Sequence, residues 1–215
     1  MPDTLNVEEA VRVLRAADPI LARLIERAGT CGFKATRAQS PFLALTESIA
    51  YQQLTGKAAA TIYGRFCALY DGRGPTPQRV LETSDEDLRA AGLSRAKALA
   101  FRDLAAKTLD GTVPTAARLH RLSDEEIIER LTSIRGVGRW TAEMLLMFRL
   151  GRPDVLPVTD YGVRKGYAIA YRKRALPTPA ELMKRGERWR PYRSVASWYL
   201  WRAVDLGGKK NGGRS

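Results

Sequence analysis

Two residue types that often carry chemistry are scarce in this chain. Its 215 residues include two cysteines, Cys31 and Cys67, and a single histidine, His120. An iron-sulfur cluster held by four thiolates is therefore excluded from this chain. One histidine also argues against a histidine-based triad and against a His-rich metal site. We expect no resident cofactor of these kinds, and two isolated cysteines argue against a disulfide framework.

Long apolar runs and alternating strand patterns are absent as well. No stretch reaches the roughly 20 apolar residues of a transmembrane helix. The opening residues MPDTLNVEEA lack the charged-then-apolar pattern of a secretory signal. No segment alternates apolar and polar residues for long enough to require a sheet. We expect an all-α protein that is cytoplasmic, monomeric and not associated with a membrane.

Positive charge is what the chain has in excess. Lysine and arginine number 36 against 23 acidic residues, which gives a formal net charge of +13. A strongly basic surface favours a polyanionic partner, although many solvated surfaces are also rich in arginine. Charge alone is therefore weak support for nucleic-acid binding.

A tight turn with two glycines organises the segment from Leu131 to Gly166. Gly136 and Gly138 flank one apolar residue, and an apolar helix is expected to begin directly after them. Glycines let a ligand approach the backbone closely, and the free N–H groups of a first helical turn bind anions such as phosphate. The alternative is that the two glycines only join two packed helices.

Helix-start signals recur along the chain. Asn6, Asp18 before Pro19, and Ser40 before Pro41 each suit an N-cap, and Ser123 with Glu126 forms a capping box. The expected helices cover residues 7–15, 19–27, 41–53, 56–70, 95–109, 160–171, 179–188 and 191–204, with two short capped segments near Pro77 and Ser84. The segment around His120 is expected to be a loop. Residues 207–215 contain no apolar side chain and should form a disordered tail.

The run IRGVGRWTA, followed by LPVTD, resembles the helix-hairpin-helix plus Gly/Pro/Asp signature of DNA base-excision glycosylases. Within that superfamily the chain most resembles the 3-methyladenine DNA glycosylase II branch. The resemblance extends upstream to YQQLT, residues 51–55, and downstream to the segment from Trp189 to Trp201. It therefore covers most of the chain beyond about residue 40.

This resemblance implies a fold of two helical lobes with a cleft between them, forming a single unit over residues 1–206. Lobe A would span about residues 41–150, and lobe B about residues 1–40 plus 151–206. The extra N-terminal mixed domain of some relatives is not expected. The implied partner is double-stranded DNA with damaged bases, and the protein would be nucleoid-associated if it is bacterial.

Asp160 matches the catalytic aspartate of the resembled family. Hydrolysis of an N-glycosidic bond develops oxocarbenium character on the sugar, and a nearby carboxylate stabilises that charge. Pro157 stiffens the approach to Asp160, and helix N–H groups would stabilise its ionised form. The alternative is that Asp160 only caps the helix that follows it.

Aromatic side chains would hold the extruded base. By resemblance, the base pocket consists of Trp140, Tyr161 and Trp201, with Met144 where some relatives have tyrosine. An aromatic face attracts the delocalised positive charge of an N-alkylated purine by about 0.5 to 2 kcal/mol. Large aromatics are also common core residues, and Trp189 and Trp198 are expected to be core.

Base extrusion needs a wedge that fills the gap in the DNA stack. Gln53 and Leu54 match the inserting pair of the family, and Leu54 is expected where a helix ends. The alternative role for Leu54 is in a core.

The resemblance also assigns the phosphate contacts. They are the main-chain N–H groups of Gly136 and Gly138, the Thr141 hydroxyl, and Arg135 and Arg139, with Lys97 as a further candidate. Family hairpins often hold a monovalent cation on main-chain carbonyls, which leave no side-chain signature in a sequence. Relatives that cleave the strand use a lysine at the position of Trp140, so no lyase activity is expected.

The expected function is a monofunctional DNA N-glycosylase for alkylated bases of the 3-methyladenine and 7-methylguanine class, which leaves an abasic site for base excision repair. Two alternatives remain open. One is a glycosylase for another lesion, such as uracil or a mismatched base. The other is a non-catalytic module that binds damaged DNA.

Overall fold

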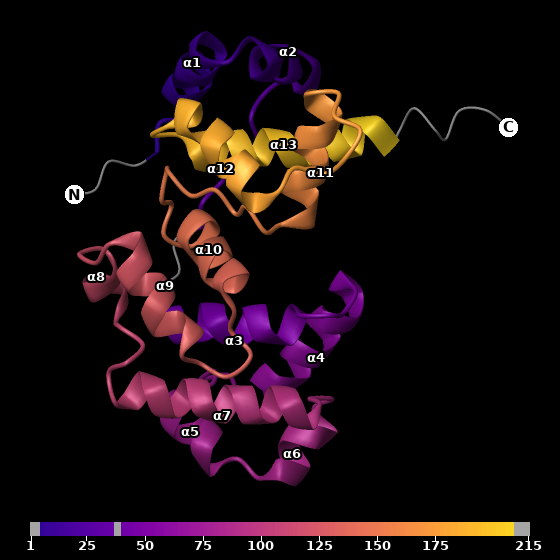
Figure 1. Ribbon diagram of the computed structural model, residues 1–215. Coiled ribbons are helices and arrows are strands. Elements are labelled where there is room, and N and C mark those ends of the chain that lie inside the picture. The colour runs from indigo at the N-terminus through magenta and orange to yellow at the C-terminus, as the bar shows by residue number, and fades with distance from the viewer. Residues whose placement is uncertain (1–4, 37–39, 209–215) are drawn as a thin grey trace, which may run out of the picture. The chain divides into compact units, whose positions relative to one another are not determined.

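The computed structural model describes residues 5–36 and 40–208. Every regular element in those two stretches is helical, which confirms the expected all-α class. In chain order (Figure 1) the elements are α1 (Val7–Ala17), α2 (Pro19–Ala28), α3 (Pro41–Tyr51), α4 (Gly56–Ala68), α5 (Pro77–Glu82), α6 (Asp85–Ala90), α7 (Arg95–Leu109), α8 (Ala116–Leu119), α9 (Asp124–Thr132), α10 (Arg139–Phe148), α11 (Tyr161–Ala170), α12 (Pro179–Gly186), the 3₁₀ helix η1 (Glu187–Trp189) and α13 (Arg193–Gly208). Within the described part of the chain, none of these helices is both long and apolar enough to cross a bilayer.

The helix starts follow from the capping residues. Asn6 accepts a hydrogen bond from the Glu9 N–H at 3.0 Å, and Asp18 caps α2 directly before Pro19. Ser123 caps α9 in a complete capping box. Each cap satisfies N–H groups that a first helical turn leaves without partners. These predicted starts are confirmed.

Two local expectations were wrong. The segment before His120 is not all loop, because α8 forms one short turn that ends at Leu119, a fully buried side chain. Helix α13 extends through residues 207 and 208, which were expected to be disordered. Gly207 packs against Ile169, since a Cβ built on this glycine would lie 3.5 Å from Ile169 Cδ1. The rest of the predicted tail, residues 209–215, lies outside the described residues.

The described chain divides into two compact units. The terminal unit consists of residues 5–36 and 146–208, and the central unit consists of residues 40–145. Helix α10 begins in the central unit and ends in the terminal unit. The predicted lobe limits near residues 40 and 150, and the cleft between lobes, stay predictions.

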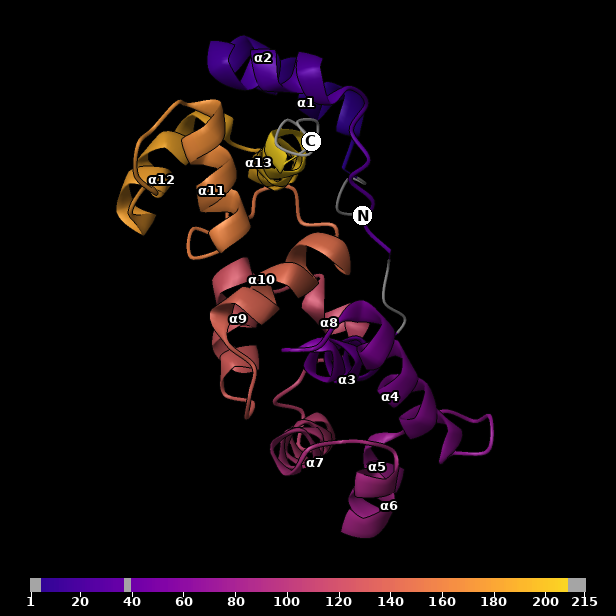
Figure 2. The same ribbon diagram turned by 90° about the vertical axis from the view of Figure 1, so that its right-hand side faces the viewer.

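The terminal unit is organised around α11 and α13, which lie side by side in both views (Figures 1 and 2). A Cβ built on Gly166 of α11 would lie 1.8 Å from the Leu200 carbonyl oxygen of α13, so only glycine allows this backbone contact. Helices α1 and α2 pack against α13, and Trp189 and Tyr199 fill the core between these elements. The close packing of α11 against α13 therefore fixes the position of the start of α11.

The central unit is organised around α7, which packs against both α3 and α5 (Figure 1). Phe101 and Leu104 of α7 are fully buried. Phe66 of α4 meets the Phe101 ring edge-on, with ring centroids 4.7 Å apart. Helix α7 also contacts the segment between α9 and α10, because a Cβ built on Gly136 would lie 3.6 Å from Ala100 Cβ.

Candidate active site and nucleic-acid interface

Asp160 caps α11. Its backbone is extended, and its Oδ1 atom accepts a hydrogen bond from the Val163 N–H at 2.7 Å. The capping role considered from the sequence is therefore present. A capping role and a catalytic role are compatible, because a carboxylate held in one orientation suits both.

A second donor reaches the same carboxylate oxygen. The Trp201 indole Nε1–H of α13 donates to Asp160 Oδ1 at 2.8 Å. Gly162 leaves room for this contact, because a Cβ built there would lie 2.7 Å from Trp201 Cδ1 and 3.1 Å from Asp160 Oδ1. Trp201 and Gly162 therefore fix the orientation of the carboxylate. The sequence assigned Trp201 only to the base pocket, and the one available signal for Gly162 was a glycine two residues after the aspartate.

Aromatic rings border Asp160 within the terminal unit. Trp201 stacks on Phe148, with ring centroids 5.9 Å apart. Tyr161 follows Asp160 directly and is 62% exposed, with Lys165 Nζ 5.8 Å from its ring centroid. Tyr161 is thus an exposed aromatic side chain that directly follows Asp160 in the chain. Phe148 was missed by the sequence reasoning, because its place beside Trp201 depends on tertiary packing.

The other two members of the predicted base pocket belong to the central unit. Trp140 and Met144 lie one turn apart on α10, on the same side of the helix. Trp140 is 45% exposed, unusually open for a tryptophan. That these two residues share one pocket with Tyr161 and Trp201 stays a prediction. Trp189 is fully buried, which confirms its predicted place in the core.

The two glycines between α9 and α10 have different roles. Gly136 has a φ of 77°, a left-handed conformation that favours glycine, whereas Gly138 has no such requirement. Nothing lies within 4 Å of a Cβ built on Gly138. The Val137 N–H closes the turn by donating to the Ile134 carbonyl at 3.0 Å. We call residues 133–138 the hairpin turn. The open side of Gly138 agrees with a ligand approaching the backbone there.

Helix α7 holds the start of the hairpin turn. Asp103 accepts a hydrogen bond from the Arg135 N–H at 2.7 Å and from Lys107 Nζ at 2.9 Å. Lys107 Nζ also donates to the Ser133 carbonyl at 2.5 Å. Burial alone would raise the pKa of Asp103, but the hydrogen bonds from Lys107 and Arg135 outweigh it and lower that pKa. The ionised Asp103 therefore anchors the hairpin turn, and no sequence motif indicated it.

The two arginines that bracket the hairpin turn are in different surroundings. Arg139 donates to both Glu125 carboxylate oxygens, at 2.6 and 3.1 Å, and to Glu143 at 3.1 Å. Its hydrogen bond lowers the pKa of Glu125. Arg135 is exposed and makes no ion pair with a described residue. Arg135 is therefore better placed for phosphate, and Arg139 would have to leave its carboxylates. Both phosphate contacts stay predictions.

Two further candidates for phosphate binding are hydrogen-bonded within the protein. The Thr141 side chain is only 5% exposed, and its Oγ1 lies 3.4 Å from Gln52 Nε2. Lys97 Nζ donates to the carbonyls of Ala50 and Gln52 at 2.6 and 3.0 Å. Burial lowers the pKa of Lys97. The main role of Lys97 is therefore to bind carbonyls at the end of α3, and contact of Thr141 with phosphate stays a prediction.

The predicted wedge lies in the turn after α3. Gln53 has a φ of 59°, which is uncommon for a residue with a side chain and marks local strain. Leu54 is 39% exposed, so it is not the core residue that was the alternative expectation. An exposed leucine on a strained turn suits insertion into a base stack. The wedge role itself stays a prediction.

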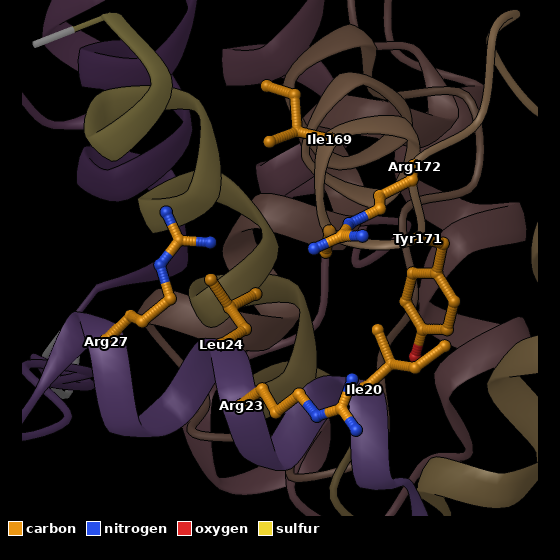
Figure 3. A pocket seen from close by; sticks show the side chains of 8 residues that line it. Ile20, Arg23, Leu24, Arg27, Ile169, Tyr171 and Arg172 are labelled. Atoms are coloured by element: carbon orange, nitrogen blue, oxygen red, sulfur yellow. The ribbon is translucent and has the colours of Figure 1, made fainter. Parts of the chain in front are cut away.

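A hollow of about 270 Å³ in the terminal unit lies away from Asp160. It is formed by α2 and the end of α11 (Figure 3), and Arg23, Arg27 and Arg172 border an apolar floor. It is lined by no pair of acidic and basic side chains and by none of the predicted site residues.

Metal binding is a separate question. Over the described residues, no cluster of three metal-binding side chains occurs. The Ser133 and Gly136 carbonyls of the hairpin turn accept hydrogen bonds from Lys107 and Gln52, and a monovalent cation at this turn stays a prediction.

Comparisons with known proteins point to one family of DNA repair proteins. Residues 46–191 match the HhH-GPD superfamily of base excision DNA repair proteins. The DNA-3-methyladenine glycosylase 1 of Schizosaccharomyces pombe is 37% identical over 217 residues, which covers 94% of each chain. A structure of the S. pombe 3-methyladenine DNA glycosylase (Mag1) in complex with abasic DNA has a TM-score of 0.82 at 38% identity, covering 92% of this chain and 97% of that one. A DNA-3-methyladenine glycosidase from Bacillus halodurans has a TM-score of 0.85 at 37% identity, covering 94% and 91%.

Proposed function

Because the chain belongs to the HhH-GPD superfamily of base excision DNA repair proteins, we propose that it is a monofunctional DNA glycosylase for alkylated bases. It binds DNA, removes bases of the 3-methyladenine and 7-methylguanine class, and leaves an abasic site. One observation carries the proposal: the carboxylate of Asp160 stands at the start of α11 with Oδ1 fixed by Val163 and Trp201. The names of the relatives supply the class of base.

Asp160 acts on the sugar. Departure of the base leaves positive charge on C1′ and the ring oxygen, and a carboxylate beside C1′ stabilises that charge in the transition state. The same carboxylate orients or deprotonates the attacking water. Two N–H donors on Oδ1 restrict rotation of the group, so little reorganisation is needed when charge develops.

The leaving base needs little acid catalysis. N-alkylation places a delocalised positive charge on the purine, which weakens the glycosidic bond and draws the base to aromatic faces. Trp201 beside Asp160 and the exposed Tyr161 supply such faces, and Trp140 and Met144 are further candidates for contact with the base. A neutral base such as uracil gains less from these rings. This contrast supports alkylated bases over the other lesions considered.

The remaining site residues bring the base out of the duplex. Leu54, with Gln53, fills the space that the extruded base vacates. N–H groups near Gly136 and Gly138, together with Arg135, hold the phosphate backbone. The protein acts as a monomer in this scheme.

Strand cleavage is not part of the proposed reaction. Relatives that form a Schiff base place a lysine where this chain has Trp140, and an indole cannot act as the amine nucleophile. Lys165 lies four residues after Tyr161 on α11 and does not match that position. The product is therefore an intact strand with an abasic site.

Base release from a panel of duplexes tests the proposal. The panel carries 3-methyladenine, 7-methylguanine, uracil or a mismatched thymine, and strand breaks are scored before and after hot alkali. We expect release of the methylated bases, with breaks only after alkali. Release of uracil or thymine alone would place the enzyme in another lesion class, and tight binding without any release would indicate a binding module. Breaks before alkali would contradict the monofunctional assignment.

A further inference from the structure

We propose that Gln52 and Lys97 are positioning residues that couple the wedge to the hairpin turn. In this arrangement the binding of phosphate by the hairpin turn determines where Leu54 enters the base stack. We call residues 52–54 the wedge turn. The inference rests on the proposed function for the role of Leu54 and for the role of the hairpin turn in DNA binding.

Gln52 connects the two turns directly. Its side-chain Nε2 donates to the Gly136 carbonyl at 3.0 Å, and it lies 3.4 Å from Thr141 Oγ1 in the first turn of α10. The two partners are 84 and 89 residues away in the chain. A single amide therefore contacts both sides of the phosphate-binding segment, and its own backbone begins the wedge turn.

Lys97 holds the wedge turn from a second direction. Its ammonium group donates to the carbonyls of Ala50 and Gln52, where α3 ends. The last carbonyls of a helix lack intrahelical partners and carry partial negative charge, so a cation there is stabilising. These contacts hold the backbone on the N-terminal side of Gln53, whose left-handed conformation must be imposed by its surroundings.

Helix α7 is the common support for both turns. Positions 97, 100, 103 and 107 share one side of the helix, by the three- and four-residue spacing of helical neighbours. Lys97 binds the wedge turn, Ala100 lies 3.6 Å from where a Gly136 Cβ would stand, and Asp103 binds the Arg135 N–H. The wedge turn and the hairpin turn are thus attached to one rigid element and to each other through Gln52.

Movement of the wedge turn without the hairpin turn would break the hydrogen bond from Gln52 to Gly136 and the one from Lys97 to Gln52. An exposed leucine on an isolated strained turn could enter DNA at many depths. A leucine whose turn is attached to the hairpin turn enters at one depth, set by the bound phosphate. Gln52 and Lys97 therefore need no contact with DNA. They act by fixing the geometry in which Leu54 is inserted.

The test uses Gln52→Glu, which keeps the size of the side chain but loses the N–H donor. The readout is the fluorescence of 2-aminopurine placed beside an abasic-site analogue in a duplex, which rises when a wedge unstacks the neighbouring base. Gln78→Glu, an exposed glutamine on α5, is the matched control for the charge change. Lys97→Met and Lys97→Arg test the second support, and thermal unfolding is measured for every variant.

We expect Gln52→Glu and Leu54→Ala each to reduce the fraction of inserted complexes by about three- to tenfold, the effect of losing one hydrogen bond or one small packing contact. The double variant should lose no more insertion than Leu54→Ala alone, because Gln52 affects insertion only through the position of Leu54. Lys97→Met should resemble Gln52→Glu, and Lys97→Arg should restore most of the signal. The salt dependence of binding to undamaged DNA should not change with Lys97→Met.

Independent, multiplicative effects of Gln52→Glu and Leu54→Ala would overturn the coupling. So would a Gln52→Glu variant that matches Gln78→Glu, or a wild-type protein that binds the duplex without a fluorescence change. The readout does not depend on catalysis. A wild-type protein that releases no alkylated base but shows the non-additive pattern would contradict the proposed function and support the coupling.

Discussion

Asp18 and Asp160 have the same local role in the terminal unit and different surroundings. Both cap a helix, α2 and α11, and both accept an indole N–H, from Trp189 at 3.1 Å and from Trp201 at 2.8 Å. Asp18 is fully buried and also binds the Tyr171 hydroxyl and Arg185. Asp160 is partly exposed, and the next residue, Tyr161, has an exposed ring. An N-cap aspartate with a tryptophan donor is thus a structural anchor in one place and a candidate catalytic group in the other.

The difference lies in what else surrounds each carboxylate. Burial alone would raise the pKa of Asp18, but hydrogen bonds from Tyr171 and Trp189 and the charge of Arg185 outweigh it and lower that pKa. A carboxylate enclosed by such partners stabilises the fold and cannot meet a substrate. Capping and a tryptophan donor are common to both aspartates. The candidate active-site aspartate differs from the anchor in being accessible and in being followed by an exposed aromatic side chain.

Asp18→Asn should have the largest effect, and it should be on stability. Asp18 is fully buried, and the Arg185 side chain opposite it is 24% exposed. Removing the Asp18 charge should therefore cost about 3 kcal/mol of unfolding free energy, the lower end for breaking a buried ion pair. Because the folded pKa of Asp18 is lowered, its contribution is present above the unfolded pKa of about 3.9 and is lost as the pH falls through the folded value. Chemical denaturation of both proteins should show a gap at neutral pH that narrows in acid. A constant gap would contradict this role for the charge.

Gly162→Ala should have the next largest effect, and it should be on catalysis. The new Cβ would stand 2.7 Å from Trp201, and displacing the ring or the carboxylate by about 1 Å can cost about 10²-fold in rate. Single-turnover base release at saturating enzyme measures it. Gly64→Ala is the control, since nothing lies within 4 Å of a Cβ at this position on α4. Equal rates for the two variants would show that the glycine has no part in the site.

Trp201→Phe separates the indole N–H from the aromatic ring. Phenylalanine keeps a face for stacking on Phe148 and loses the donor to Asp160 Oδ1, so base release should fall by about tenfold, the upper range for one hydrogen bond. The dissociation constant for DNA should change little. A large loss of DNA affinity with an unchanged rate would instead assign Trp201 to base binding alone.

The smallest predicted effect concerns the two hairpin arginines. Arg135→Gln should reduce the slope of log affinity against log salt by about 0.9, the value for one phosphate contact on B-DNA. Arg139→Gln should change the slope less, because its guanidinium is held by Glu125 and Glu143. Fluorescence anisotropy with undamaged duplex over a salt series measures both. A larger change for Arg139 would mean that it leaves its carboxylates on binding.

The helices and the hairpin turn could be predicted because their determinants are local. Caps such as Ser123 and a left-handed residue such as Gly136 leave a recognisable pattern within a few residues. The same holds for Asp160, whose position after Pro157 places it at the start of a helix. The resemblance to a known family then supplied a chemical role for a residue that local physics identified only as a cap.

Contacts between distant residues could not be predicted from this sequence. Trp201 meets Asp160 across 41 residues, and Gln52 meets Gly136 across 84. Lys97 was considered for phosphate because of its charge, yet its neighbours in space are carbonyls at the end of α3. Arg139 likewise pairs with Glu125, fourteen residues earlier. The residue type shows that each of these side chains can form hydrogen bonds. Its partner depends on the packing of distant segments.

The most direct test of the central claim is base release from methylated duplex DNA by the wild-type protein and by Asp160→Asn, with DNA affinity measured on the same samples. The amide keeps an oxygen that can accept the Val163 N–H, so the helix cap is retained while the negative charge is lost. Asp205→Asn, at an exposed aspartate paired with Arg202, is the control. We predict that Asp160→Asn releases bases about 10²- to 10³-fold more slowly, with unchanged affinity. Release at close to the wild-type rate would contradict the assignment of Asp160 as the catalytic carboxylate.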